Sequence, residues 1–209
     1  MSKQIENENG WRGSPQAWFD AAIEILLESG VQAVNISALA KRLKLSRTSF
    51  YWFFADKEAL LSALVNTWKE KNTGSIVQQS QAYADSLAEA ALNIFDCWLD
   101  EELFDSKFEF AIRSWSIHST QIQHEVQLAD QLRLDALTAM FKRYGFSEIS
   151  ADVHARTIYL MQIGYISMQT KESLAQRMER IPLYIQTFTG ELPKAHELER
   201  FFHRHHYQV

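Results

Sequence analysis

Arginine, hydroxyl and aromatic side chains are gathered in residues 47–54, the part of the chain best suited to chemical recognition. If this segment is helical, Phe50, Phe53 and Phe54 share one face, because residues three and four positions apart lie together. The opposite face then carries four candidate contact residues: Arg47, Thr48, Tyr51 and Trp52. Guanidinium and hydroxyl groups can reach the base edges and phosphate oxygens of DNA. The spacing therefore predicts a helix that packs through aromatic rings on one side and faces DNA on the other.

Helical patterns before and after this segment would position it. A first helix is expected from the cap residue Ser14 to Gly30, a residue typical of the position just past a helix end. A shorter helix follows the cap residue Asn35, and a tight turn joins it to the helix expected over residues 46–54. Two short helices joined in this way form a helix-turn-helix, whose second helix enters the major groove of DNA. Asp56 is expected to cap a fourth helix.

The composition is that of a globular protein from a reducing compartment. Apolar residues make up 46% of the 209 positions, enough for a sizeable core. The single cysteine, Cys97, excludes an intrachain disulfide framework. The polar N-terminus does not resemble a signal peptide, and the uncharged apolar runs are too short to cross a bilayer. These features predict a cytoplasmic protein without a membrane partner.

Positive charge is concentrated around the helix-turn-helix. Residues 36–57 contain five basic residues and one acidic residue, whereas residues 59–209 contain 14 basic and 19 acidic residues. A basic region on an otherwise acidic protein indicates an anionic partner for that region alone. Charge and helix pattern thus both favour double-stranded DNA as the partner.

Residues 18–61 resemble, without a gap, the N-terminal domain of the TetR family of transcriptional regulators. That family reads roughly as an alanine-rich helix, Glu-x-Gly, a capping threonine and "IA..AGVS.GTLY.YF.SKE.L". The matching segments of this chain are "AAIEILLESG", "LAKRLKLS" and "SRTSFYWFFADKEALL". The resemblance covers about a quarter of the chain, and the aromatic run followed by "DKEAL" is its most specific part.

The resemblance implies roles for individual residues of this sequence. Tyr51 and Lys57 match positions that contact phosphates, and Asn35 replaces the usual threonine cap. Lys44 stands where most members have glycine, so a left-handed turn would be strained there, while the lysine adds a charge beside the duplex. The full set of candidate DNA-binding residues is Asn35, Lys44, Ser46, Arg47, Thr48, Ser49, Tyr51, Trp52 and Lys57. Ser37 is interpreted as a first-turn helix residue and not as a contact.

The rest of the chain also has helical periodicity, so the expected fold class is all-α. Long helices are expected over residues 75–100, 105–120, 120–145, 150–169 and 172–189. We predict two domains: a helix-turn-helix DNA-binding domain at residues 12–72, and a helical ligand-binding and dimerisation domain at residues 75–209. The resemblance implies that the last two long helices form a homodimer interface, with faces that include Val153, Ile158, Met161, Tyr165, Met168, Met178, Leu183 and Ile185. The same residues could equally belong to the core of one chain.

Aromatic residues in the second domain suggest a ligand pocket. Phe95, Phe104 and Phe108 are possible wall residues, but an aromatic stripe at helical spacing more often belongs to a core. The residues selected as ligand-binding candidates are Trp98, Phe110, Arg113, Trp115, His118 and Tyr159. The abundance of aromatic rings favours an apolar or aromatic small molecule.

An enzyme or a metal protein is the alternative class. The C-terminus gathers histidines beside Glu199, namely His196, His203, His205 and His206, although their spacing matches no closed metal site. No Walker loop, dinucleotide-binding glycine pattern, HExxH motif or GxSxG motif is present. The sequence therefore predicts a non-enzymatic regulator without a cofactor or resident metal: a homodimer that binds a palindromic operator as a repressor and is released by a small-molecule inducer.

Overall fold

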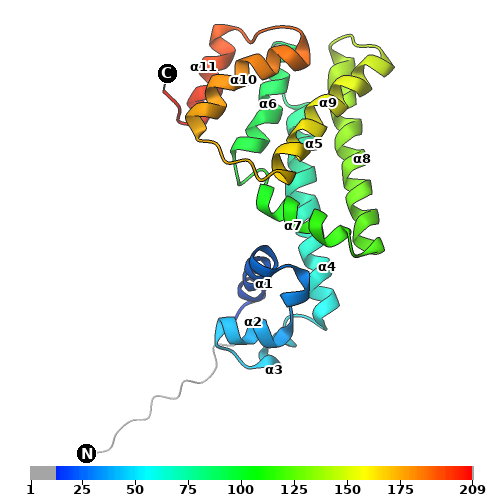
Figure 1. The fold of residues 1–209 in the computed structure, drawn as a ribbon, viewed down its shortest axis with the longest axis vertical. Coiled ribbons are helices and arrows are strands. Elements are labelled where there is room, and N and C mark those ends of the chain that lie inside the picture. Colours follow the sequence, from blue (N-terminus) through cyan, green and yellow to red (C-terminus); the bar gives the residue numbers. More distant parts are fainter. Residues whose placement is uncertain (1–12, 209) are drawn as a thin grey trace, which may run out of the picture. The chain divides into compact units, whose positions relative to one another are not determined.

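The computed structural model describes residues 13–208, and every regular element among them is helical (Figure 1). The first elements are α1 (Pro15–Ser29), η1 (Val31–Ala33), α2 (Ile36–Leu43), α3 (Arg47–Phe50), α4 (Lys57–Trp68) and η2 (Lys69–Thr73). The later ones are α5 (Gly74–Gln81), α6 (Leu87–Leu99), α7 (Ser106–Ser116), α8 (Thr120–Arg143), α9 (Glu148–Ser167), α10 (Leu174–Thr189) and α11 (Ala195–Arg204). The all-α prediction is confirmed. None of the described helices combines the length and apolar character that a membrane span requires.

The chain divides into two compact units, with the boundary between Asn66 and Thr67. Unit 1 holds the helix-turn-helix, and unit 2 holds the later helices. The boundary falls within α4, a few residues before the predicted limit at residues 72–75.

Side-chain caps define the helices of unit 1. The hydroxyl of Ser14 accepts a hydrogen bond from the Ala17 amide at 3.1 Å, and Asn35 Oδ1 accepts one from the Ala38 amide at 3.0 Å. Asp56 Oδ1 accepts a bond of 2.7 Å from the amide of Ala59 and so begins α4. These polar groups satisfy amides that lack a partner in the first turn, and they lie where the sequence predicts them.

The recognition segment is less helical than expected. The predicted helix over residues 46–54 is a single turn, α3, after which Tyr51, Trp52 and Phe53 form a turn. The amide of Phe54 still bonds to the carbonyl of Phe50 at 3.1 Å, so the helical path is nearly kept. The predicted faces are therefore preserved although the regular helix is short.

The helix that leaves unit 1 does not end at Trp68. A π turn, η2, follows α4 directly and α5 follows η2, so the backbone is helical from Lys57 to Gln81. The single helix expected over residues 75–100 is wrong: it is interrupted at residues 82–86, and Tyr83 is 85% exposed instead of buried. The interruption has a local cause, since the Ser86 hydroxyl accepts the amide hydrogen of Glu89 at 3.1 Å and starts α6.

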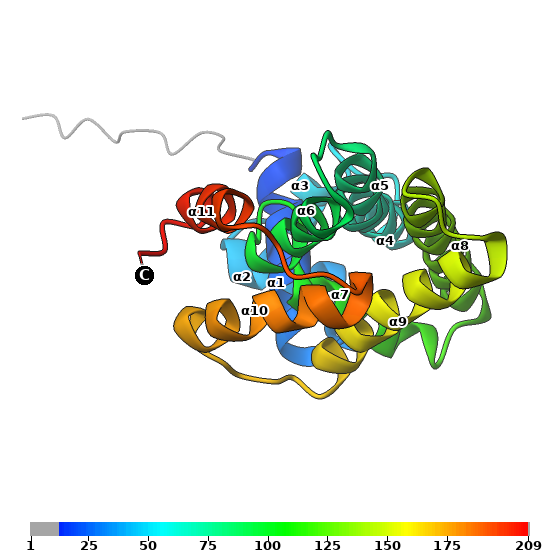
Figure 2. The same cartoon turned by 90° about the horizontal axis from the view of Figure 1, so that it is seen from above.

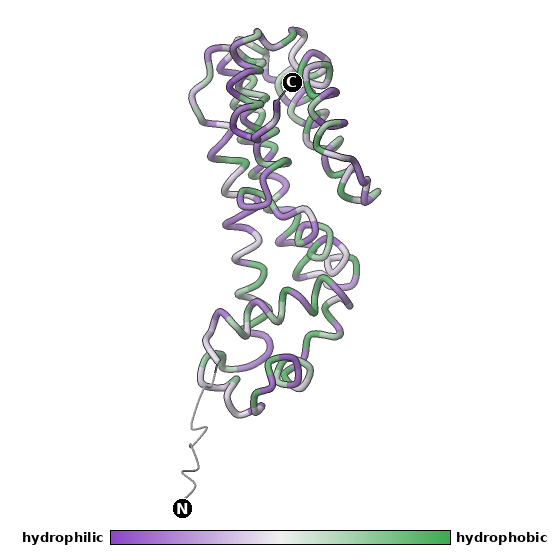
Figure 3. The backbone as a smooth tube through the Cα atoms, turned by 90° about the vertical axis from the view of Figure 1, so that its left-hand side faces the viewer, coloured by the Kyte–Doolittle hydropathy of each residue, from purple (hydrophilic) through white to green (hydrophobic). Residues whose placement is uncertain are grey.

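Unit 2 is built around α6. This helix is buried along nearly its whole length and packs against α5, α10 and α11, while α8 lies along α9 (Figure 2). Hydrophobic and hydrophilic residues alternate along most helices, as Figure 3 shows. The apolar stripes meet in one core that includes Leu92, Phe141 and Ile158. Burial of these stripes fixes the helix positions, because apolar area removed from water stabilises the fold by roughly 25 cal/mol per Å².

Candidate functional site

Five of the nine predicted DNA-binding residues line one open cleft on unit 1, whereas Lys44, Ser46, Ser49 and Trp52 do not. The start of α2 contributes Asn35, Ile36 and Ser37 to its wall, and the first residue of α4 contributes Lys57. Between them lie residues of the recognition segment: Arg47, Thr48 and Tyr51. The cleft therefore joins the starts of two helices, where backbone amides favour an anion, to guanidinium, ammonium and hydroxyl groups.

The recognition segment is held by one buried aromatic ring. Phe50 is fully buried, with its ring 5.4 Å from Trp18 in an edge-to-face arrangement and 5.5 Å from Phe54 in a stacked one. Tyr51 and Trp52 remain 58% and 63% exposed. The expected division into a packed face and an outer face is confirmed for these residues.

Two serines of the predicted set serve the backbone of this segment. Ser46 caps α3, accepting a hydrogen bond from the Ser49 amide at 3.3 Å. Ser49 is only 9% exposed, and its hydroxyl lies 3.0 Å from that of Ser46. Ser49 therefore lies beneath the exposed surface, whereas Ser37, which was not predicted to be a contact, lines the cleft. The position of Ser37 in the first turn of its helix is the sequence feature that could have predicted this.

The basic residues of unit 1 differ in how their charge is used. Arg42 forms ion pairs with Glu24 and Glu28 of α1, so its charge is neutralised within the unit. Within the described part of the chain, Lys44, Arg47 and Lys57 form no ion pair. Arg47 and Lys57 line the cleft, so unpaired positive charge is left there, which suits a polyanion.

Lys44 adopts the left-handed conformation that glycine usually takes. Its φ and ψ are 55° and 38°, and its amide bonds to the carbonyls of Ala40 and Lys41, which closes the end of α2. A residue with a Cβ atom is strained in this region by roughly 1–2 kcal/mol. The departure from the family pattern therefore carries a cost in stability.

Replacing Lys44 with glycine is expected to raise the free energy of unfolding of unit 1 by about 0.5–1 kcal/mol. The relief of strain exceeds the entropy that glycine adds to the unfolded chain. Lys44→Ala keeps the strain and removes the same charge, so it is the matched control. Urea unfolding followed by tryptophan fluorescence would measure both; equal stability of the glycine and alanine variants would contradict the role assigned to the backbone.

The ligand-binding residues selected from sequence do not surround one cavity. Trp98 belongs to the core at 4% exposure, His118 is exposed in the turn after α7, and Phe110 and Trp115 are partly buried on α7. The remaining two, Arg113 and Tyr159, belong to a buried polar cluster. None of these six residues lines the small cavity of unit 2 that is described below.

The buried polar cluster centres on Glu109 of α7, which is fully buried. Its carboxylate accepts hydrogen bonds from Arg133 at 2.7 and 3.1 Å, and from Arg113 at 2.8 Å. It also accepts bonds from the Trp68 indole at 2.6 Å and the Asn72 amide at 2.9 Å. The carboxylate therefore ties α7 and α8 to the π turn that follows α4.

Tyr159 extends this cluster to α9. Its hydroxyl accepts hydrogen bonds from Arg113 and Arg133, both at 2.9 Å, and donates one to Asp130 at 2.6 Å. Arg133 also donates to the Thr73 hydroxyl at 2.9 Å. Buried charges are retained only where such bonds satisfy them, so the cluster fixes the register of the π turn.

The cluster predicts a loss of stability in acid. Burial alone would raise the pKa of Glu109, but Arg133, Arg113 and the Asn72 amide outweigh it and lower that pKa from 4.5 to about 2. Because the pKa is lower in the folded state, the carboxylate stabilises the fold above pH 4.5, and this contribution is lost as the pH falls towards 2. The loss is expected to reach about 3 kcal/mol. Urea unfolding between pH 6 and 3 should show a weaker pH dependence for Glu109→Gln than for the wild type; equal slopes would contradict the assignment.

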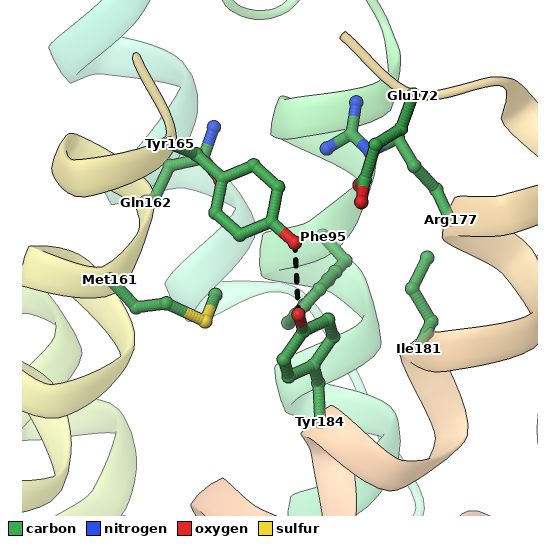
Figure 4. A pocket seen from close by; sticks show the side chains of 8 residues that line it. All are labelled: Phe95, Met161, Gln162, Tyr165, Glu172, Arg177, Ile181 and Tyr184. Carbon is green, nitrogen blue, oxygen red and sulfur yellow. Dashed lines mark hydrogen bonds between the residues drawn. The ribbon is translucent and has the colours of Figure 1, made fainter. Parts of the chain in front are cut away.

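A small cavity lies elsewhere in unit 2, between α6, α9 and α10 (Figure 4). Its walls are Phe95, Met161, Gln162, Tyr165, Glu172, Arg177, Ile181 and Tyr184. The hydroxyls of Tyr165 and Tyr184 are 2.9 Å apart across it, and this bond raises the pKa of Tyr165 to about 12. The remaining space, about 10 Å³, holds roughly one water molecule. Of the aromatic wall residues suggested by the sequence, Phe95 lies here.

The C-terminal histidines belong to α11 and the turn after it, elements not expected from the sequence. His205 is within 2.7 Å of the Asp96 carboxylate, while His196, His203 and His206 are exposed. Among the described residues, no group of three or more potential metal ligands comes together. The arrangement therefore gives no support to the alternative of a histidine metal site.

An exposed apolar face runs along α9 and α10. On α9, Ile149, Val153 and Leu160 are 79%, 54% and 57% exposed, and on α10 Leu183 is 61% exposed. Of the predicted interface residues, Val153, Met168 and Leu183 are exposed, Met161 and Tyr165 are partly buried, and Ile158, Met178 and Ile185 lie in the core. Each helix thus has one face in the core and part of another exposed to solvent, a pattern that marks interaction surfaces.

A helix-turn-helix with an exposed basic surface, followed by a helical unit with a cavity, is the architecture of a DNA-binding protein. Residues 19–64 match the family model described as "Bacterial regulatory proteins, tetR family". This N-terminal segment is therefore a DNA-binding domain of the TetR type.

Curated relatives match part of the chain, and solved structures share its fold. The chain is 35% identical over 74 residues to tetracycline repressor protein class G of Vibrio anguillarum, covering 35% of either chain. It is 33% identical over 81 residues to the uncharacterized HTH-type transcriptional regulator YdeS of Bacillus subtilis (strain 168), covering 36% of this chain and 41% of that one. The chain thus spans only about a third to two fifths of the length of these relatives. The structure of the fatty acid degradation regulator FadR from Bacillus halodurans has a TM-score of 0.61 at 18% identity, covering 88% of this chain and 98% of that one. At such identity, the likeness shows the fold alone.

Proposed function

We propose that this protein is a cytoplasmic transcriptional regulator that binds a near-palindromic DNA operator as a homodimer and acts as a ligand-responsive repressor. The observation that carries the proposal is the cleft of unit 1, where Arg47, Tyr51 and Lys57 lie beside the start of α2. Its chemistry suits recognition of DNA and requires no nucleophile or metal.

The cleft residues divide into two kinds of contact. Lys57 and the hydroxyl of Tyr51 are suited to phosphate oxygens, which set the position of the protein on the duplex. Arg47 and Thr48 begin α3, the end of a recognition helix that usually meets base edges. An arginine can pair with the O6 and N7 atoms of guanine, so Arg47 is the residue proposed to read sequence.

A homodimer would form through the exposed apolar face of α9 and α10. A two-fold axis places the same surface on both subunits, so Val153 and Leu183 would contact the equivalent helices of a second copy. Two recognition segments would then reach half-sites separated by roughly 34 Å or a multiple of it. This explains why a near-palindrome is expected.

Ligand control would act through the helices of unit 2. The backbone is helical without interruption from α4 through the π turn to α5, so a shift of α5 can be passed to unit 1. Coupling between two sites is typically ~1–3 kcal/mol, which would change operator affinity about 5–150-fold. An inducer that favours the non-binding arrangement would release the operator.

Selection of bound duplexes from a random DNA pool tests the proposal. The full chain should enrich a near-palindromic site, while an Arg47→Ala/Tyr51→Ala double variant, run in parallel, should enrich none. Sedimentation and circular dichroism of both proteins would establish that each is folded and dimeric. Failure of the folded dimeric wild type to enrich any sequence at low salt would overturn the assignment.

A further inference from the structure

We propose that the cavity between α6, α9 and α10 binds a small organic monocarboxylate with an apolar, preferably aromatic, body. In this arrangement the carboxylate bonds to the guanidinium of Arg177 and the body lies against Phe95, Met161 and Ile181. The inference rests on the proposed function in one respect only, namely that this molecule is the one that controls DNA binding.

Arg177 reaches the cavity from the first turn of α10 and lies beside Glu172 (Figure 4). Its Nη1 donates to the Trp98 carbonyl at 2.9 Å, and it forms no ion pair with any described residue. Glu172 also lines the cavity, but it is ion-paired with Arg180. A guanidinium offers five donors in a planar fork that matches a carboxylate, so most of the recognition capacity of Arg177 is unused.

Burial makes this arginine costly in its present surroundings. Desolvation lowers the pKa of Arg177, and the nearby groups Glu172 and Tyr165, which act in the opposite direction, do not outweigh it. By contrast, Arg133 in the buried polar cluster has two hydrogen bonds to Glu109. An anion in the cavity would give Arg177 the kind of partner that Arg133 already has.

Two further polar groups near the cavity have unused hydrogen-bonding capacity. Gln162 lines it and is 5% exposed, yet its side-chain amide forms no hydrogen bond within residues 13–208. The indole nitrogen of Trp98 is buried and likewise has no partner among the described residues. The Trp98 ring packs on Phe95, a wall residue, with centroids 4.8 Å apart. Buried polar side chains are nearly always paired, so an unpaired amide in the cavity wall, with an unpaired indole behind the wall residue Phe95, indicates a binding site.

The walls favour a flat apolar body. Tyr184 is stacked with Phe95 at 6.5 Å and with Phe188 at 6.2 Å, and Met161 and Ile181 supply the aliphatic part of the lining. Offset-stacked aromatic rings and flexible thioethers adapt well to an aromatic ligand. These features select an amphipathic molecule over a simple inorganic anion.

Tyr165 and Tyr184 close this cavity, and the hydrogen bond between their hydroxyls is called the latch below. Their mutual hydrogen bond joins α9 to α10 and leaves too little space for an organic molecule. Both side chains are partly exposed, so rotation about their side-chain bonds can open the cavity without a change of fold. A ligand must therefore break the latch and alter the packing of α9 against α10, the helices that carry the exposed apolar face.

Isothermal titration of the full chain with matched carboxylate and amide pairs tests the proposal. The probes are benzoate, 2-naphthoate and octanoate, each compared with its neutral amide. We expect at least one carboxylate to bind about 10-fold or more tightly than its amide, since a charged hydrogen-bonded pair is lost in the amide. Arg177→Met should remove this difference, and Arg177→Lys should retain part of it. Arg156→Met, an exposed arginine of α9, is the control and should leave the difference unchanged.

The latch makes a separate prediction for the same titration. Tyr165→Phe removes the hydroxyl bond that competes with the ligand, so the carboxylate should bind about 2–10-fold more tightly. Equal binding of carboxylate and amide, or no carboxylate binding to folded wild-type protein, would overturn the proposal; neither result depends on the folding of a variant. If duplex selection fails but the carboxylate binds more tightly than its amide, the proposed function is wrong and the carboxylate site stands. If duplex selection succeeds but carboxylate and amide bind equally, the proposed function stands and the carboxylate site is wrong.

Discussion

Replacing Arg133 with methionine is expected to lower the free energy of unfolding of unit 2 by about 3–5 kcal/mol. Arg133 is fully buried and gives Glu109 two of its hydrogen bonds. Methionine matches much of the apolar volume of the arginine side chain, but it leaves part of the negative charge of Glu109 uncompensated. It also removes the hydrogen bonds that Arg133 donates to Thr73 and Tyr159. Urea unfolding of the full chain, followed by far-UV circular dichroism, measures the change.

Arg156→Met is the matched control for this variant. Arg156 also forms an ion pair, with Asp152 on the same helix, but its side chain is 49% exposed. Water can replace the lost interaction there, so the unfolding midpoint should stay within the scatter of repeated measurements. An equally small change for Arg133→Met would contradict the role assigned to the buried polar cluster.

A double variant separates charge pairing from packing. In Glu109→Leu with Arg133→Met, both members of the central pair become apolar, so no uncompensated carboxylate remains. The loss of stability should therefore be smaller than the sum of the two single losses, which is the sign of direct coupling. Additive losses would mean that the two residues act independently, despite separations of 2.7 and 3.1 Å.

Sequence patterns predict the structure best in unit 1. Ser14, Asn35 and Asp56 are local signals, because a cap acts on an amide two or three residues further along, and all three cap a helix in the structure. The burial of Phe50 and the exposure of Tyr51 follow from helical spacing alone. The shortness of α3 does not, since a turn with nearly helical hydrogen bonds has the same periodicity.

The errors in unit 2 have two physical origins. At Ser86 a cap signal was present, but the apolar periodicity on both sides predicted a continuous helix. At α11, Leu198, Phe201 and Phe202 have the spacing of an amphipathic helix, but the neighbouring histidines suggested a metal site instead. A local signal existed in both places, but apolar periodicity outweighed it at Ser86 and the histidine-rich composition outweighed it at α11.

The cavity and the buried polar cluster could not be predicted in the same way. Arg177 meets the Trp98 carbonyl across 79 residues, and Arg133 meets Glu109 across 24. Such pairs depend on which helices become neighbours, and helical periodicity does not determine that. This is why Arg113 and Tyr159 were expected in a pocket, whereas they hydrogen-bond to one another within the buried polar cluster.

On DNA, Lys57→Ala and Arg47→Ala are expected to weaken binding in different ways, although both remove one charge from the same cleft. Lys57 is proposed to contact a phosphate, so its loss should weaken binding to all sequences alike and reduce the slope of log affinity against log salt by about one. Arg47 is proposed to read a base, so its loss should reduce discrimination at one position of each half-site by about 5–150-fold. Fluorescence anisotropy with the selected operator, a single-base variant and an unrelated duplex, at several salt concentrations, separates the two patterns.

Lys171→Ala, an exposed lysine in the loop between α9 and α10, is the control and should leave affinity, salt slope and discrimination unchanged. If Lys57→Ala and Arg47→Ala both behave like this control, the cleft is not the surface that meets DNA. If the two variants lose affinity in the same way, the cleft meets DNA but does not read its sequence through Arg47.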